Sequence, residues 1–86
     1  MDTHILEKAR NLNKFSPTPI ILDIAERFVY RPDMGTFDNY IRCVILGHNG
    51  FNEVFNFASE RALDCAIDYM NKNPNFKMRE LIKYVK

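Results

Sequence analysis

The apolar residues nearest the N-terminus recur every three or four positions. They are Ile5, Leu6, Ala9, Leu12 and Phe15. This spacing places the side chains on one side of an α-helix. The pattern therefore predicts a helix over residues 3–14.

The next segment carries signals for both helix and strand. Thr18 suits a helix N-cap and Pro19 suits the first turn, and a helical apolar stripe follows at Ile21, Ile24, Ala25 and Phe28. These features predict a second helix over 19–27. The residues of 27–31 are equally typical of a strand, and the turn formers of 32–35 would return the chain alongside it. We favour a third strand at 27–31.

Residues 36–58 alternate between the two faces of a predicted hairpin. The loop His48-Asn49-Gly50 suits a three-residue connection whose last residue, the glycine, has a left-handed backbone. This loop gives strands over 36–46 and 51–58. Its register pairs Gly47 with Phe51, Ile45 with Glu53, Cys43 with Phe55 and Ile41 with Phe57, because paired positions keep a constant sum along an antiparallel ladder.

The predicted hairpin has one apolar face and one mixed face. We expect burial of the face that carries Phe37, Ile41, Cys43, Ile45, Phe51, Phe55 and Phe57. The mixed face carries Tyr40, Arg42, Val44, Leu46, Asn52, Val54 and Asn56, and a third strand is expected to add Phe28 and Tyr30 to it. This face either meets a partner or packs its valines and leucine on the first helix.

Two further helices are predicted after the hairpin. Ser59 is an N-cap for a helix over 59–72, with an apolar stripe at Ala62, Leu63, Ala66, Ile67 and Met70. Asn73-Pro74 ends it and starts a last helix over 74–85, with a stripe at Met78, Leu81, Ile82 and Val85. The prediction is an α+β fold in a single compact domain over 1–86, in which helices cover the phenylalanine face of the sheet.

Composition narrows the classes of function. The chain has 86 residues and a net charge of +1, so it can build one core and has no long-range field that attracts nucleic acid or a membrane surface. The sequence contains no run of about 20 apolar residues and no signal-peptide pattern. Two cysteines without a disulfide framework indicate a reducing compartment, which predicts a cytoplasmic protein. Abundant residues with AT-rich codons, such as Asn, Ile and Phe, indicate an AT-rich genome, for which a virus or phage is one of the possible sources. If the protein is viral, the cytoplasm is that of the host.

The candidate catalytic residues are isolated from one another. Cys43 falls on the apolar face, which raises the pKa of a thiol and makes it inert, and Cys65 has no base placed beside it. His4 and His48 lack metal-ligand spacing, and Asp64 with Asp68 fits a solvated helix face better than a pair of catalytic acids. We therefore predict no enzyme, no catalytic residue, no metal and no cofactor.

The mixed face supplies the functional hypothesis. Tyrosine and arginine are enriched in protein interfaces, so we predict a small protein-binding module that masks a site on a partner, as an inhibitor or a viral or phage accessory protein does. The predicted partner-binding residues are Tyr30, Tyr40, Arg42, Asn52 and Asn56.

A second hypothesis from the same residues is binding of RNA or DNA. Aromatic, arginine and asparagine side chains also stack on bases and bind their edges. A basic C-terminal segment would add phosphate contacts through Lys72, Lys77, Arg79, Lys83 and Lys86. The same basic residues fit a solvated tail that stabilises a helix C-terminus. A homodimer through an exposed strand edge is compatible with either hypothesis.

Overall fold

The computed structural model of the chain describes residues 3–16 and 18–85. Its elements are α1 (Thr3–Lys14), β1 (Ile21–Arg31), β2 (Thr36–Leu46), β3 (Asn52–Phe57), α2 (Glu60–Lys72) and the 3₁₀-helix η1 (Met78–Tyr84). The strands form one antiparallel sheet in the order β1-β2-β3. The predicted α+β class is confirmed, and α1 has the predicted bounds.

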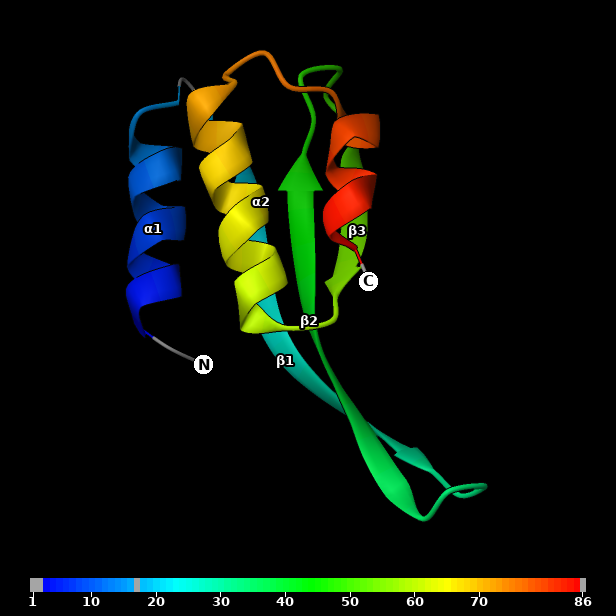
Figure 1. The fold of residues 1–86 in the computed structure, drawn as a ribbon. Helices are drawn as coiled ribbons and strands as arrows, with labels where there is room; N and C mark the ends of the chain where they lie inside the picture. Colours follow the sequence, from blue (N-terminus) through cyan, green and yellow to red (C-terminus); the bar gives the residue numbers. More distant parts are fainter. Residues whose placement is uncertain (1–2, 17, 86) are drawn as a thin grey trace.

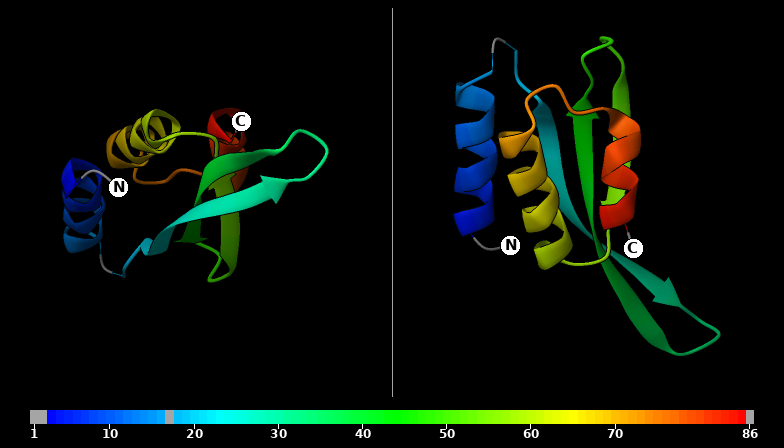
Figure 2. Two further views of the ribbon diagram at one scale, coloured as in Figure 1. Left: turned by 90° about the horizontal axis from the view of Figure 1, so that it is seen from below. Right: turned by 45° about the horizontal axis from the view of Figure 1, so that its top comes forward.

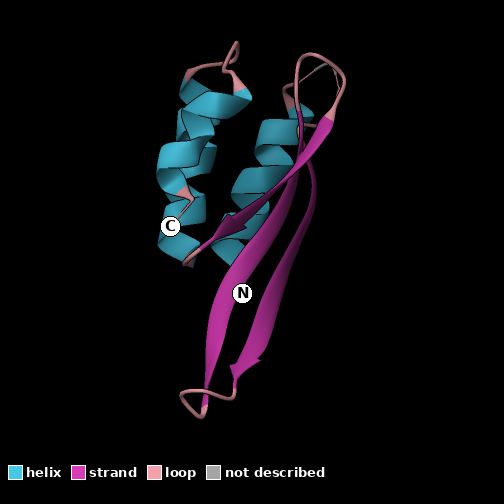
Figure 3. Cartoon of the chain, turned by 90° about the vertical axis from the view of Figure 1, so that its right-hand side faces the viewer, coloured by secondary structure: helices cyan, strands magenta, loops and turns pink. Residues whose placement is uncertain are grey.

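The helices form a layer on one face of the sheet (Figures 1 and 2). The core lies between this layer and the sheet. Its fully buried side chains are Cys43, Ile45, Phe57, Leu63, Ile67, Met70 and Leu81. Figure 3 views the sheet from the side, with the helices on one side of the strands and no described helix on the other. We call the face without helices the open face.

The predicted helix over 19–27 is wrong, because residues 21–31 form strand β1. The strand predicted at 27–31 is confirmed as the end of this longer strand. β1 pairs with β2 from Ile21 opposite Ile45 to Arg31 opposite Thr36, with a bulge at Leu22. The long ladder satisfies the backbone of a segment rich in β-branched and aromatic residues, and this tertiary pairing overrides the local helical signal.

The register predicted for β2 and β3 is confirmed. Ile41 lies opposite Phe57, Cys43 opposite Phe55 and Ile45 opposite Glu53. Gly50 has a φ of 84°, as the predicted loop requires. β3 covers residues 52–57, so the predicted strand 51–58 is one residue too long at each end.

Two phenylalanines predicted to be buried are exposed instead. Phe37 lies on the core side of β2 but beyond the end of the helical layer, and 64% of its surface is exposed. Phe51 adjoins the loop at the opposite end of the sheet and is 71% exposed. The prediction used the correct faces, but it assumed that helices cover the whole length of the hairpin.

The last helical segments differ in how well they were predicted. α2 begins one residue after its predicted start, and Ser59 is its N-cap, with the Ser59 hydroxyl accepting a hydrogen bond from the Ala62 amide. The predicted helix over 74–85 is wrong in extent and type, because η1 is a 3₁₀-helix over 78–84.

The 3₁₀ conformation explains which side chains of η1 reach the core. With three residues per turn, Met78, Leu81 and Tyr84 lie on one side, and all three pack on the core. Ile82, which an α-helical stripe would bury, is exposed. Glu80 fixes the start of η1, because its carboxylate accepts hydrogen bonds from the Lys77 amide and the Tyr69 hydroxyl. These bonds, the Lys77 bond first, lower the pKa of Glu80.

The hairpin of β1 and β2 extends well past the helices (Figure 1). The molecule is 44 Å long, and its radius of gyration is 13.4 Å. A compact chain of this length would have a radius of gyration of about 12 Å. The extension accounts for the difference. We call residues 28–39 the arm.

Asn13 joins α1 to the start of β1. Its side-chain oxygen accepts hydrogen bonds from the Ile20 and Ile21 amides, both at 2.8 Å, and its side-chain nitrogen donates to the Ile21 carbonyl at 2.7 Å. The amide side chain supplies an acceptor oxygen and a donor nitrogen from one group. Asn13 thereby positions β1 beneath the helical layer.

We predict that Asn13→Ala lowers the free energy of unfolding by roughly 2–4 kcal/mol, because three partly buried backbone groups lose their partner. Asn13→Asp keeps the acceptor oxygen, so its free energy of unfolding should lie between those of the original protein and Asn13→Ala. Urea denaturation followed by circular dichroism measures both. Asn11→Ala, at an exposed position of α1, is the matched control and should change stability by less than about 0.5 kcal/mol. Equal stability of all four proteins would show that the Asn13 contacts contribute nothing.

Candidate interaction surface

The strand register gathers four predicted binding residues on the open face. Tyr40 and Arg42 lie within β2, and Arg42 is opposite Asn56 of β3. Asn52 of β3 lies opposite Leu46, at the far end of the face. Opposite partners share a face of an antiparallel sheet. The structure thus brings Tyr40, Arg42, Asn52 and Asn56 onto one surface.

Arg42 lies at the centre of this surface. It is half-buried between its strand neighbours Ala25 and Asn56. Its Nε atom is shielded from solvent and makes no hydrogen bond within the described part of the chain. A shielded donor without an acceptor carries a free-energy cost, which an acceptor supplied by water or by a bound partner would remove.

Apolar side chains border Arg42. Val44 pairs with Val54 across β2 and β3, and Val54 is 58% exposed. The alternative that the valines and leucine of this face pack on the first helix is wrong, because α1 buries Ile5, Ala9 and Leu12 in the core on the opposite side. The open face is therefore a mixed polar and apolar surface.

Tyr30 and Phe28 do not belong to the open face. Tyr30 pairs with Phe37 and Phe28 with Asn39, which places them on the core side of the sheet. The expectation that they join Tyr40 and Arg42 is wrong. It assumed that the even-numbered residues of β1 share a face with the even-numbered residues of β2, whereas they share a face with the odd-numbered ones. Arg27, which pairs with Tyr40, takes that position instead. Arg27 could have been found by extending a hairpin ladder outward from the turn at 32–35.

Beyond the helical layer, the arm exposes an aromatic surface on its core side. Phe28 is 62% exposed and Tyr30 is 54% exposed. The Tyr30 and Phe37 rings are 5.1 Å apart between centroids. On the open face of the arm, Arg31 pairs with Asp38 at 2.7 Å. We call Phe28, Tyr30 and Phe37 the aromatic patch.

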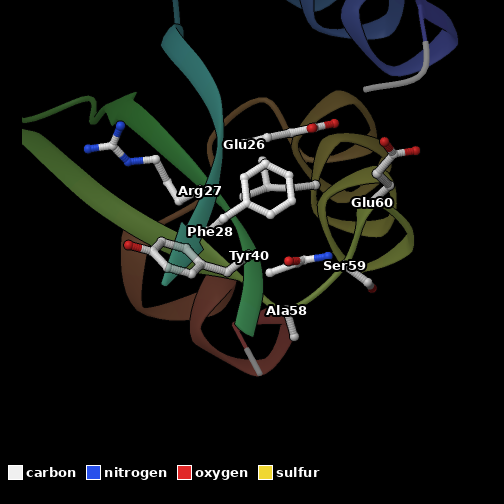
Figure 4. A pocket seen from close by; sticks show the side chains of 9 residues that line it. Glu26, Arg27, Phe28, Tyr40, Ala58, Ser59 and Glu60 are labelled. Atoms are coloured by element: carbon white, nitrogen blue, oxygen red, sulfur yellow. The ribbon is translucent and has the colours of Figure 1, made fainter. Parts of the chain in front are cut away.

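A small hollow lies where the arm leaves the helical layer (Figure 4). It is lined by residues 26–28 and 39–41 of the two strands and by residues 58–60, which lead into α2. Its volume is about 180 Å³. Figure 4 shows Phe28 and Glu60 beside it. The hollow is continuous with the aromatic patch through Phe28.

The basic residues of the nucleic-acid hypothesis lie apart from Arg42. Lys72 ends α2, and Lys77, Arg79 and Lys83 belong to the start or body of η1, on the helical side of the sheet (Figure 3). Lys83 lies over the rings of Tyr69 and Tyr84. Lys86 falls outside the described residues. The two halves of the predicted nucleic-acid site are thus on opposite sides of the sheet.

Other candidate chemistry has structural explanations. Asp64 and Asp68 both pair with Lys8 of α1, and their hydrogen bonds raise the pKa of Lys8. They connect α1 to α2. Within residues 3–16 and 18–85, no group of His, Cys, Asp and Glu could hold a metal ion. No helix of these residues has the length and apolar character needed to cross a lipid bilayer.

No protein-family model, curated protein or solved structure matches the chain. Any functional assignment therefore depends on the chain's own surfaces.

The two cysteines differ in environment. Cys43 is fully buried, and burial, with a smaller effect of the Asp23 charge, raises its pKa to about 12. Cys65 is exposed on α2. We predict that a thiol reagent at neutral pH modifies Cys65 in the folded protein and Cys43 only after unfolding. Peptide mass spectrometry after timed labelling identifies the modified residue, and rapid labelling of Cys43 in the folded protein would contradict the packing described here.

The Cys43 pKa also gives a pH dependence with a definite sign. The folded state binds the thiol proton more tightly than the unfolded state, whose thiol has the ordinary pKa of 9.0. The stability due to this group is therefore complete below about pH 9 and is lost as the pH rises toward 12. As the pH rises from about 9 toward 12, the free energy of unfolding of Cys43→Ala should therefore fall less than that of the original protein.

Proposed function

We propose that the chain is a small non-enzymatic protein-binding module that acts through its open face. The observation that carries the proposal is the position of Arg42, half-buried on a helix-free sheet face with its Nε unpartnered among the described residues. Tyr40 beside it and the exposed Val54 across the sheet give the face the composition of an interface core.

The chemistry of the face indicates the kind of partner. The side chains of Arg42, Arg27 and Tyr40 carry hydrogen-bond donors, and Val44 and Val54 provide apolar contact area on the same face. A partner surface with a carboxylate or carbonyl group among apolar residues would complement both. Binding of this kind masks the partner's surface and needs no catalytic group. The proposed role is therefore an inhibitor or a viral or phage accessory protein, acting in a cytoplasm that keeps both cysteines as free thiols.

Identification of the partner comes first in the test. The tagged chain is used to capture proteins from its native cell, with and without nuclease, and a captured protein is purified and titrated against the chain. We predict that Arg42→Ala and Tyr40→Ser each weaken the affinity for this protein by about tenfold or more, because buried arginine and tyrosine contacts carry much of an interface's binding energy. Isothermal calorimetry provides the dissociation constants.

Arg61→Ala is the matched control, since Arg61 is an exposed arginine on α2 in the helical layer. It should leave the affinity unchanged. If Arg42→Ala binds as tightly as the original protein, the open face is not the binding surface. Capture that nuclease abolishes, with an affinity for oligonucleotides that falls steeply with salt, would support the nucleic-acid hypothesis instead.

A further inference from the structure

Strand β1 forms one edge of the sheet. Within the described residues it pairs only with β2, so its outer side has no neighbouring strand. Successive residues of a strand direct their backbone N–H and C=O groups to alternate sides, so every second residue of an edge strand directs both groups away from the sheet. A row of such groups is complementary to the backbone of another extended chain.

Hydrogen bonds at the end of the sheet fix the phase of this alternation in β2. The Leu46 amide donates to the Ile20 carbonyl, which lies on the side of β1. The next amide, that of Gly47, donates to the Phe51 carbonyl on the side of β3. The even-numbered residues of β2 therefore direct their backbone groups toward β1.

The pairing of the strands carries this phase over to β1. Along the arm, the even-numbered residues of β2 lie opposite odd-numbered residues of β1, such as Tyr40 opposite Arg27. Residues that face each other in this way exchange their hydrogen bonds, so Arg27 and Val29 direct their backbone groups inward. Phe28 and Tyr30 consequently direct theirs outward, away from the sheet.

The chain covers the start of this edge but not the arm. Asn13 bonds both the N–H and the C=O of Ile21, as the backbone of a neighbouring strand would, and a bulge follows at Leu22. Bulges, prolines and lysines are the usual means by which proteins prevent pairing at a strand edge. Residues 28–31 contain none of them. The edge is therefore open to an added strand along the arm.

The side chains beside the outward groups indicate what kind of extended chain fits. Residues that lie opposite each other in paired strands have their side chains on the same face. A residue added opposite Phe28 or Tyr30 would thus lie on the core side, against rings that are 62% and 54% exposed. An apolar side chain at each of these two positions would cover the rings.

The residue added between those two apolar positions and its outer neighbours would lie on the open face. β1 and β2 place three arginines and two aspartates on this face: Arg27, Arg31, Arg42, Asp23 and Asp38. Asp38 pairs with Arg31, and no ion pair within the described residues joins Arg27 or Arg42 to an acid. Asp23 is four residues from Arg27, about 13 Å along the strand. A carboxylate opposite Arg27 would therefore meet an uncompensated positive charge.

A second copy of the same edge would supply the wrong charge. Two β1 edges related by a two-fold axis at Phe28 would place the two Arg27 side chains diagonally across from each other. An axis at Val29 would place Arg27 of each copy opposite Arg31 of the other. Both arrangements bring arginines together, whereas a segment of another protein can carry an acid at this position.

We propose that β1 accepts an extended segment of another protein as an added strand along residues 27–31. The segment carries apolar residues opposite Phe28 and Tyr30 and an aspartate or glutamate opposite Arg27. Its backbone bonds the outward groups of β1, and the alternation of its side chains gives specificity. The inference goes beyond the proposed function, because it uses the edge of the sheet, whereas that function uses the open face.

A phage-displayed library of random peptides of about ten residues, selected on the immobilised full chain, tests the proposal. We predict that the enriched peptides alternate apolar with polar residues and carry an aspartate or glutamate next to an apolar position. Absence of enrichment, or enriched peptides without this alternation, overturns the proposal. One enriched peptide is then synthesised and titrated against the chain by fluorescence anisotropy.

Methylation of single amide nitrogens in this peptide tests for strand pairing. Every second amide of an added strand donates to β1, and the amides between them point to solvent. Methylating an amide of the first set should weaken the affinity by about tenfold or more, and methylating its neighbour should leave the affinity unchanged. Equal effects at neighbouring amides would contradict an added strand.

Variants of the chain locate the peptide on β1. Tyr30→Pro removes an outward N–H without removing a bond to β2, so it should bind the peptide more weakly than Tyr30→Ala, which loses only the ring. Arg27→Glu should weaken binding by about tenfold or more. Arg61→Glu, at an exposed position of α2, is the matched control and should bind like the original protein. Circular dichroism confirms that each variant is folded.

The same titrations separate this inference from the proposed function. If Tyr30→Pro binds the peptide as tightly as Tyr30→Ala, or Arg27→Glu as tightly as Arg61→Glu, the edge of β1 is not the binding site. Loss of binding by Val54→Ser, with Tyr30→Pro unaffected, would place the peptide on the open face. That result overturns the added strand and leaves the proposed function standing.

Discussion

The architecture depends on a mismatch in length between paired strands and the layer that covers them. β1 and β2 each have eleven residues, whereas β3 has six. The chain leaves β3 at Phe57, opposite Ile41, and turns directly into α2. On the helical side of Ile41, the core-side residues Cys43 and Ile45 of β2 are buried, and beyond Ile41 only β1 and β2 continue, as a two-stranded ribbon. A two-stranded ribbon has little stability of its own, so its anchored end at the core must hold it.

This mismatch creates two unlike surfaces. The open face exists because all described helices lie on the other side of the sheet, which leaves Arg42 and Val54 uncovered. The aromatic patch exists because the helices end before the ribbon does, which leaves Phe37 uncovered on the core side. One surface suits a mixed polar and apolar partner, and the other suits an apolar one. The two surfaces lie on opposite sides of the sheet, so a molecule that covers one leaves the other uncovered.

Local sequence signals predicted the parts of the fold that local physics determines. The loop ending at Gly50 fixed the register of β2 and β3, and Ser59 marked the start of α2. The start of β1 was missed because the stripe of Ile21, Ile24 and Phe28 fits a helix as well as a strand. Only pairing with β2, which is distant in sequence at this point, decides between them. The same pairing fixes the face of Tyr30, so this predicted site residue was placed on the wrong surface. Coverage by a helix is also a long-range property, which is why the exposure of Phe37 could not be inferred from its alternation with neighbouring residues.

Amide hydrogen exchange tests most directly whether the core anchors only the base of the hairpin. The hydrogen-bonded ladder amides of residues 41–46 should exchange at the rate of global unfolding. The ladder amides of residues 28–31 and 36–39 should exchange faster by about two orders of magnitude or more, through opening of the ribbon alone. Equal protection along the whole hairpin would contradict this account.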